Sequence, residues 1–79
     1  MLNKNDVMRI KNDIQGSIGN KVRLQCGRGA HQTIHDNCVL TDAYSDVFTV
    51  QLYQGQNPYR KLSYTYVDVM TNAVRLTFY

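Results

Sequence analysis

The sequence lacks the usual marks of an enzyme. Glutamate is absent, so all six acidic residues are aspartates, and they are scattered along the chain. Paired carboxylates for general acid–base catalysis are therefore not indicated. A glycine-rich phosphate-binding loop and a serine-centred nucleophile elbow are also missing. We expect a protein that is not an enzyme.

Long apolar segments and cysteine-rich patterns are missing as well. No stretch approaches the ~20 consecutive apolar residues that cross a bilayer. The opening residues, MLNKNDVMRIKND, are too polar for the apolar core of a signal peptide. The two cysteines are too few for the disulfide framework of a small secreted domain. We expect a cytoplasmic protein with reduced thiols and no membrane contact.

Length and charge limit the kind of site that this chain can form. At 79 residues it has room for one small domain. Such a domain buries only roughly 60 to 65% of its unfolded surface, so a deep catalytic pocket is not expected. The net charge is +3, and six of the nine lysine and arginine residues precede residue 32. This bias is compatible with a nucleic acid or an acidic protein surface as partner.

Helical spacing of apolar residues predicts one α-helix over about residues 5–15. Arg9 and Asp13 are four residues apart, so we expect them to pair across one turn. The residues that form the apolar face are Val7, Ile10 and Ile14.

From residue 20 the apolar period changes from 3.6 to 2, which predicts five β-strands. They cover about residues 21–26, 33–40, 48–52, 62–66 and 74–78. The HDN segment interrupts the second strand and predicts a bulge. The segment YQGQNPY is expected to connect a hairpin, because glycine, asparagine and proline favour turns. VDVMTN predicts a tight turn or one helical turn, in which Asp68 bonds nearby backbone amides.

Five strands with one apolar side each must bury those sides against something. We predict a mainly β fold in one domain, residues 1–79: an N-terminal helix and a small five-stranded SH3-like barrel over about 20–79. An OB-type barrel is the alternative, and in either case the helix plugs one open end. If the first and last strands pair, Arg23 and Arg75 share an outer face, with Lys21 and Lys61 nearby.

Three segments resemble the Veg family of small cytoplasmic proteins from Firmicutes: GNKVRLQCGRGAHQTI, DAYSDVFTVQL and LSYTYVDVMTNAVRLTF. The most specific feature is a Tyr-x-x-Val-Phe segment combined with a Ser-Tyr-x-Tyr-x-Asp-Val-Met-Thr block. The resemblance implies an SH3-like barrel with an N-terminal helix, and a non-enzymatic regulatory role associated with transcription and biofilm formation. The residues that carry the motif are Tyr44, Val47, Phe48, Ser63, Tyr64, Tyr66, Asp68, Val69, Met70 and Thr71.

The loop after the first strand departs from this family pattern. Family members usually carry a short arginine and lysine run where this chain has Ala30, His31 and Gln32. The departure removes positive charge from the loop. Arg28 remains, and His31 contributes charge only when it is protonated. A nucleic-acid role of this loop is weakened accordingly.

Both cysteines and both histidines lie within the thirteen residues CGRGAHQTIHDNC. Zinc prefers sulfur and imidazole ligands, but the spacings of four, three and two intervening residues match no common zinc module. We expect the cysteines to pack as small hydrophobic residues and the histidines to face solvent. The candidate zinc set is Cys26, His31, His35 and Cys38, and no cofactor is predicted.

Two functional classes stay open. A regulatory adaptor that binds another protein is favoured by the family resemblance, and a nucleic-acid-binding β-barrel by the basic first half of the chain. Tyrosines suit both classes, because they stack on bases and also fill protein interfaces. Exposed strand edges further permit a homodimer. The candidate binding residues are Lys21, Arg23, Arg28, Tyr53, Tyr59, Arg60, Lys61 and Arg75.

Overall fold

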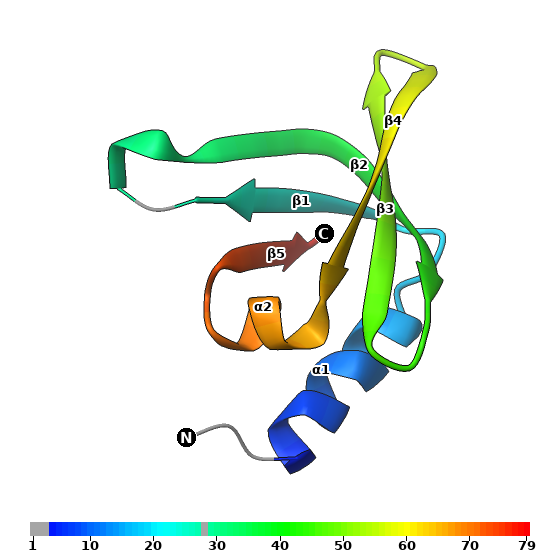
Figure 1. Ribbon diagram of the computed structural model, residues 1–79. Coiled ribbons are helices and arrows are strands. Elements are labelled where there is room, and N and C mark those ends of the chain that lie inside the picture. Colours follow the sequence, from blue (N-terminus) through cyan, green and yellow to red (C-terminus); the bar gives the residue numbers. More distant parts are fainter. Residues whose placement is uncertain (1–3, 28) are drawn as a thin grey trace.

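A computed structural model describes residues 4–27 and 29–79 (Figure 1). Its elements in chain order are helix α1 (Lys4–Gln15), strand β1 (Lys21–Cys26), the 3₁₀ turn η1 (Gly29–His31), strands β2 (Thr33–Ala43), β3 (Val47–Gln54) and β4 (Asn57–Thr65), helix α2 (Tyr66–Met70) and strand β5 (Val74–Phe78). The predicted helix and all five predicted strands are present. Neither helix of the described residues is long and apolar enough to cross a membrane.

The strands form one antiparallel sheet in the order β4-β3-β2-β1-β5. The first and last strands pair, β1 with β5, so the condition for a shared outer face of Arg23 and Arg75 is met. The predicted barrel is wrong in one respect: β4 and β5 are the two edges of the sheet and do not pair, so the sheet stays open. Helix α2 connects these edges and packs on both strands, and α1 packs on α2 (Figure 1). Helix α2 thus lies between the two edge strands that would have to pair to close a barrel.

The core lies on the side of the sheet that faces these helices. Alternating strand residues supply most of it, in agreement with the period of 2 in the sequence. Burying one such aliphatic or aromatic side chain stabilises the fold by roughly 1.5–3 kcal/mol. No polar or charged side chain of the described residues is buried. The buried residues are Ile14, Val22, Leu24, Cys38, Leu40, Phe48, Val50, Leu52, Tyr66 and Val74.

The β3–β4 hairpin is tighter than the sequence predicts. Strand pairing continues to Gln54 and Asn57, so only two residues remain in the turn. The first of them, Gly55, has φ +65°, the left-handed conformation that two-residue hairpins require. Pro58 lies on the edge strand β4, a position in a sheet where proline is tolerated. The predicted hairpin connection is confirmed, but it is shorter than the YQGQNPY segment, because residues on both sides of the turn pair in β3 and β4.

Helix α2 begins with a reciprocal pair of hydrogen bonds. Thr65 Oγ1 accepts from the Asp68 backbone N–H at 3.0 Å, and Asp68 Oδ2 accepts from the Thr65 N–H at 3.1 Å. This arrangement is a capping box, which satisfies two amides that the helix leaves unpaired. The predicted backbone-bonding role of Asp68 is confirmed.

Replacing the capping residue should therefore destabilise the fold. We expect Thr65→Ala to lower the free energy of unfolding by about 1 kcal/mol, because the Asp68 amide loses its acceptor. Urea denaturation followed by circular dichroism measures the change. Ser63→Ala, an exposed residue on the same strand, is the matched control. Equal losses in the two variants would show that the cap is not the cause.

Candidate functional site

A row of basic residues lies on the outer face of β1 and β5. The register pairs Arg23 with Thr77, and Gln25 with Arg75. Directly paired residues point to the same side of a sheet, so Arg23 and Arg75 share one face. Lys21 lies on the same face, because it is two residues from Arg23. All three basic residues are exposed, and the predicted outer face is confirmed.

Nearby aspartates neutralise part of the predicted basic surface. Arg23 Nε lies 2.7 Å from Asp36 Oδ1, and Lys61 Nζ lies 3.4 Å from Asp42 Oδ2. Both pairs are exposed, so each adds at most about 1 kcal/mol of stability. Their effect on the surface potential is larger, because each pair cancels a positive charge that a phosphate would need.

Lys61 is not a neighbour of Lys21. Lys61 on β4 pairs with Gln51 on β3, which pairs with Val39 on β2, and Val39 in turn pairs with Lys21 on β1. Three steps of the usual strand spacing amount to about 14 Å. The expectation that Lys61 lies near the outer face of Arg23 and Arg75 is wrong, because β4 is three strands away from β1. Lys21 and Arg75 are then the basic residues of the outer face that form no ion pair within the described residues.

The second predicted group lies at the β3–β4 hairpin. Tyr53 pairs with Pro58, which places Tyr59 and Arg60 beside the turn. Tyr59 and Arg60 are exposed, and Tyr53 is half-buried. Figure 1 shows the hairpin projecting from the body, away from β5. The predicted binding residues thus form two separate groups, and Arg28 lies outside the described residues.

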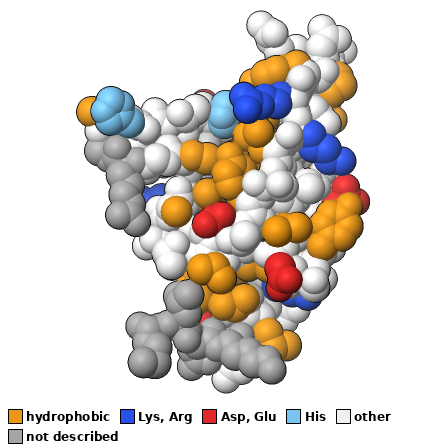
Figure 2. Space-filling model, in the orientation of Figure 1, with side chains coloured by type: hydrophobic (Ala, Val, Ile, Leu, Met, Phe, Trp, Pro, Cys, Tyr) orange, Lys and Arg blue, Asp and Glu red, His pale blue; other side chains and the backbone are white. Residues whose placement is uncertain are grey.

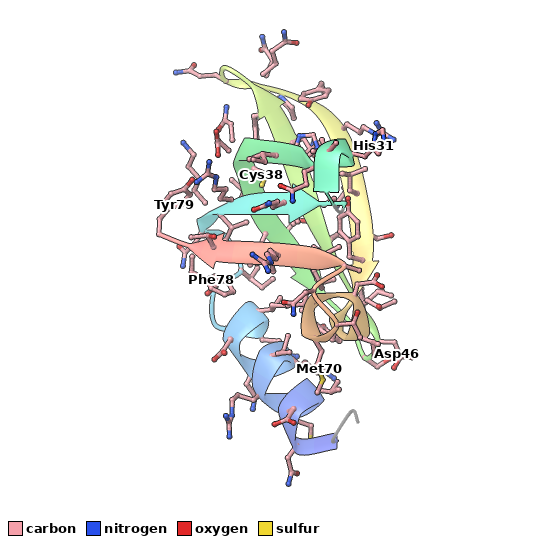
Figure 3. All side chains as sticks on the ribbon, turned by 90° about the vertical axis from the view of Figure 1, so that its left-hand side faces the viewer. His31, Cys38, Asp46, Met70, Phe78 and Tyr79 are labelled. Atoms are coloured by element: carbon pink, nitrogen blue, oxygen red, sulfur yellow. The ribbon has the colours of Figure 1, made fainter. Side chains whose placement is uncertain are left out.

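The candidate zinc ligands have different environments. Cys38 is buried, and its thiol donates to the Val22 carbonyl oxygen at 3.0 Å; burial raises the pKa of this thiol. The Cys26 thiol donates to Tyr64 Oη at 3.3 Å. His31 is exposed on η1, away from Cys38 (Figure 3), whereas His35 is half-buried instead of fully exposed as predicted. Within residues 4–27 and 29–79, no three histidine, cysteine or acidic side chains are grouped to hold a metal.

The predicted bulge accounts for part of this arrangement. The β1–β2 register shifts between Val22 and Leu24, opposite the HDN segment. The extra residue on β2 keeps Cys38 paired with Val22 on the core side. Cys38 therefore packs as a small hydrophobic residue, as expected.

Aromatic residues bring the two motif segments together. The ring centroid of Phe48 lies 6.2 Å from that of Tyr64 and 5.7 Å from that of Tyr66. The Tyr66 hydroxyl donates to the Tyr44 carbonyl oxygen at 2.6 Å, and the Tyr66 N–H donates to the Asp46 carbonyl oxygen at 3.3 Å. Aromatic pairs at such distances add about 0.5–1.5 kcal/mol beyond burial. The Tyr-x-x-Val-Phe segment and the tyrosine-rich block therefore form one packing unit.

Comparison with protein families finds a match over most of the chain. A family model described as biofilm formation stimulator VEG matches residues 5–77. The chain belongs to the VEG family. No curated protein matches it.

The motif residues of this VEG-family chain serve mainly to build the fold. Phe48 and Tyr66 are buried, and Tyr64 is half-buried. Thr71 ends α2 with two hydrogen bonds to the Val67 carbonyl oxygen, one from its backbone N–H and one from its Oγ1, each at 2.9 Å. Tyr44 is different, because its ring is exposed while its carbonyl holds Tyr66. A ligand would contact other parts of the surface or the Tyr44 ring.

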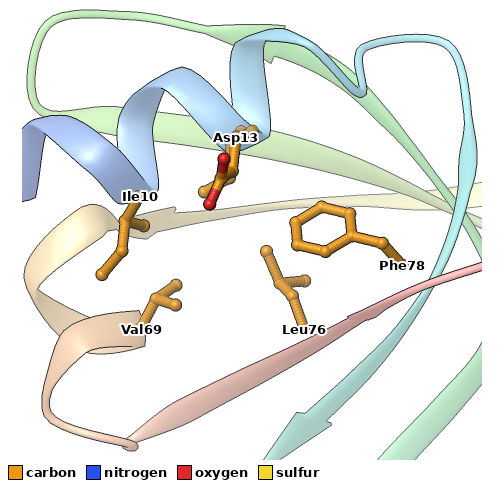
Figure 4. A pocket seen from close by; sticks show the side chains of 6 residues that line it. Ile10, Asp13, Val69, Leu76 and Phe78 are labelled. Atoms are coloured by element: carbon orange, nitrogen blue, oxygen red, sulfur yellow. The ribbon is translucent and has the colours of Figure 1, made fainter.

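Sequence reasoning missed a small apolar hollow between α1, α2 and β5 (Figure 4). We call it the α1–β5 hollow. The pattern of α1 identified an apolar face, but no signal placed that face against the last strand, at the other end of the chain. The residues that line the hollow are Ile10, Asp13, Ile14, Val69, Leu76 and Phe78.

Tyr64 and Tyr66 should make stability depend on alkaline pH. Burial raises the pKa of Tyr64 above its ordinary value of 10.0. Burial, with Asp46 nearby, also raises the pKa of Tyr66. The folded chain thus holds both phenol protons more tightly than the unfolded chain. Their contribution to stability is complete below about pH 10 and is lost as the pH rises from there toward the folded pKa.

We expect Tyr64→Phe to reduce this alkaline loss, because the variant has one proton fewer to lose. The urea midpoint, measured in steps above about pH 10, should fall less steeply in the variant than in the parent chain. Tyr59→Phe, at an exposed position, should keep the parental slope. Identical slopes for the parent and Tyr64→Phe would contradict the assignment.

Proposed function

We propose that this VEG-family chain is a non-enzymatic regulatory adaptor that acts through protein contacts on transcription and biofilm formation. Family membership links it to the stimulation of biofilm formation. The observation that carries the proposal is the set of large apolar and aromatic side chains that remain exposed. They are Met8, Ile18, Ile34, Tyr44, Tyr59, Val67, Phe78 and Tyr79.

The kind of side chain that is exposed supports a protein partner. Figure 2 shows hydrophobic side chains at several places on one face, from the β3–β4 hairpin down to the helices, with polar and charged side chains between them. Single exposed apolar residues are normal in any protein, so the type of the exposed residues is the stronger observation. Four of the eight exposed residues are tyrosine or phenylalanine, residues that are enriched in the buried centres of protein interfaces.

The charges also favour a protein over a nucleic acid. Binding to phosphates depends on cations that release counterions from the nucleic acid. Arg23 and Lys61 already face aspartates, which reduces their value for such contacts. The exposed tyrosine of the hairpin, Tyr59, lies apart from the outer face that carries Arg75.

Affinity capture tests the proposal. We expect the immobilised chain to retain a specific protein from the cytoplasm of its native cells, and mass spectrometry identifies it. Retention should persist after nuclease treatment and at raised salt, because apolar contacts are not screened. Lys21→Gln should retain the same protein. Capture that disappears with nuclease, or the absence of any specific protein, would contradict the adaptor function.

A nucleic-acid-binding sheet is the second candidate, and the outer face is the observation that favours it. Lys21 and Arg75 form no ion pair within the described residues and lie on the same face as Arg23. If this face binds phosphates, the double variant Lys21→Gln/Arg75→Gln should reduce the salt slope of binding to mixed-sequence single-stranded DNA by about 1.4, because each lost phosphate contact removes about 0.7. Fluorescence polarisation measures the slope. No binding of the parent chain at low salt would exclude this candidate.

A further inference from the structure

The α1–β5 hollow exists because of the way α1 is held. Helix α1 packs against α2 and β2, and a space remains between α1 and β5 (Figure 4). Ile14 in this space is 1% exposed, whereas Phe78 at the last strand is 43% exposed. The hollow is therefore apolar and open to solvent at one side.

The size of the hollow limits what it can hold. Its volume is about 70 Å³. Sites for small organic ligands usually enclose roughly 300–1,000 Å³. The hollow thus suits one aliphatic side chain of a partner, which is the size of an anchor residue in a protein interface.

Asp13 adds a charge to this apolar site. Figure 4 shows its carboxylate directed toward the space between Ile10 and Phe78. The predicted Arg9–Asp13 pair does not form, and within residues 4–27 and 29–79 Asp13 has no ion pair. Asp6 lies seven residues earlier on the same side of α1 and is also exposed, and the exposed Arg9 lies on that side between them. This side of α1 therefore carries two negative charges and one positive charge, and the carboxylate at the hollow itself complements a lysine or arginine of a partner.

Strand β5 provides a backbone surface next to the hollow. It is an edge strand, because β1 is its single partner in the described sheet. Edge strands carry unpaired N–H and C=O groups that can accept another strand. Leu76 and Phe78 are two residues apart and both line the hollow, so their side of β5 faces it. An extended segment beside β5 would direct alternate side chains to the same side.

We propose that the α1–β5 hollow docks an extended segment of a partner protein. One aliphatic side chain of that segment enters the hollow, and a neighbouring lysine or arginine pairs with Asp13. The inference rests on the proposed adaptor function, and it adds the docking surface and the chemistry of the partner.

A displayed library of random decapeptides, selected on the immobilised full chain, tests this inference. Enriched sequences should share an aliphatic residue next to a lysine or arginine. A synthetic peptide of the enriched sequence should bind Asp13→Asn and Phe78→Ala roughly tenfold more weakly than the parent chain, since both variants remove a central contact. Ile34→Ala, which changes an equally exposed residue on β2 (46%), should bind the peptide as the parent does. Circular dichroism of each variant checks that it is folded.

Backbone pairing has its own readout. Two versions of the peptide are compared, one N-methylated at its odd-numbered amides and one at its even-numbered amides. One version should lose binding and the other should keep it, because only alternate amides of the peptide strand face β5. Equal affinities of the two methylated peptides for the chain would exclude pairing of the peptide with β5.

Three further outcomes would overturn the inference: no enriched sequence, enrichment of acidic peptides, or affinities that Asp13→Asn and Phe78→Ala leave unchanged. Capture of a native protein separates this inference from the adaptor function. If that protein binds both variants as well as the parent chain, the hollow is not the docking site and the adaptor function stands. If the parent chain captures no protein, the adaptor function itself fails.

Discussion

The packing of Phe48 against Tyr64 and Tyr66 is the contact on which the rest of the structure depends. It joins β3 and β4 to the first residue of α2, and the Tyr66 hydroxyl extends it to the Tyr44 carbonyl. With α2 held in this way, the chain turns back from β4 and delivers β5 to β1. The same helix supports α1. One aromatic cluster therefore positions both helices and the last strand.

The open sheet is a consequence of this arrangement and matters for function. If β4 and β5 paired, the chain would have no free strand edge and no space beside α1. Because α2 lies between them instead, β5 keeps an edge next to an apolar hollow. The VEG-family motif is thus connected to a candidate binding surface through the fold, although most of its residues do not lie on that surface.

Charge is distributed differently in three dimensions and along the chain. The first half of the sequence is basic, but the fold places Asp36 against Arg23 and Asp42 against Lys61. The aspartate of α1 that was expected to pair with Arg9 instead lies at the hollow. The net charge of +3 therefore describes the surface poorly, because a partner experiences the local electrostatic potential. Ion pairs and unpaired charges at each site set that potential.

Much of the fold was predictable, because local patterns carry it. The periods of 3.6 and 2 identified α1 and all five strands, and the HDN interruption identified the bulge opposite Val22. Asp68 was assigned correctly from the turn chemistry of its own segment. The β3–β4 connection was predicted too long, because residues on an exposed strand edge follow no apolar alternation.

The sequence by itself determined the elements, the outward direction of Arg23 and Arg75 on their own strands, and the resemblance that the VEG-family match confirmed. Tertiary structure decided the β1–β5 pairing that brings those two arginines to one face, the open sheet, the neutralisation of Arg23 and Lys61, and the hollow that joins Asp13 to Phe78. The physical reason is how far apart along the chain the interacting residues are. Periodicity and capping depend on residues a few positions apart, whereas ion pairs across strands and spaces between helix and sheet depend on how distant segments pack.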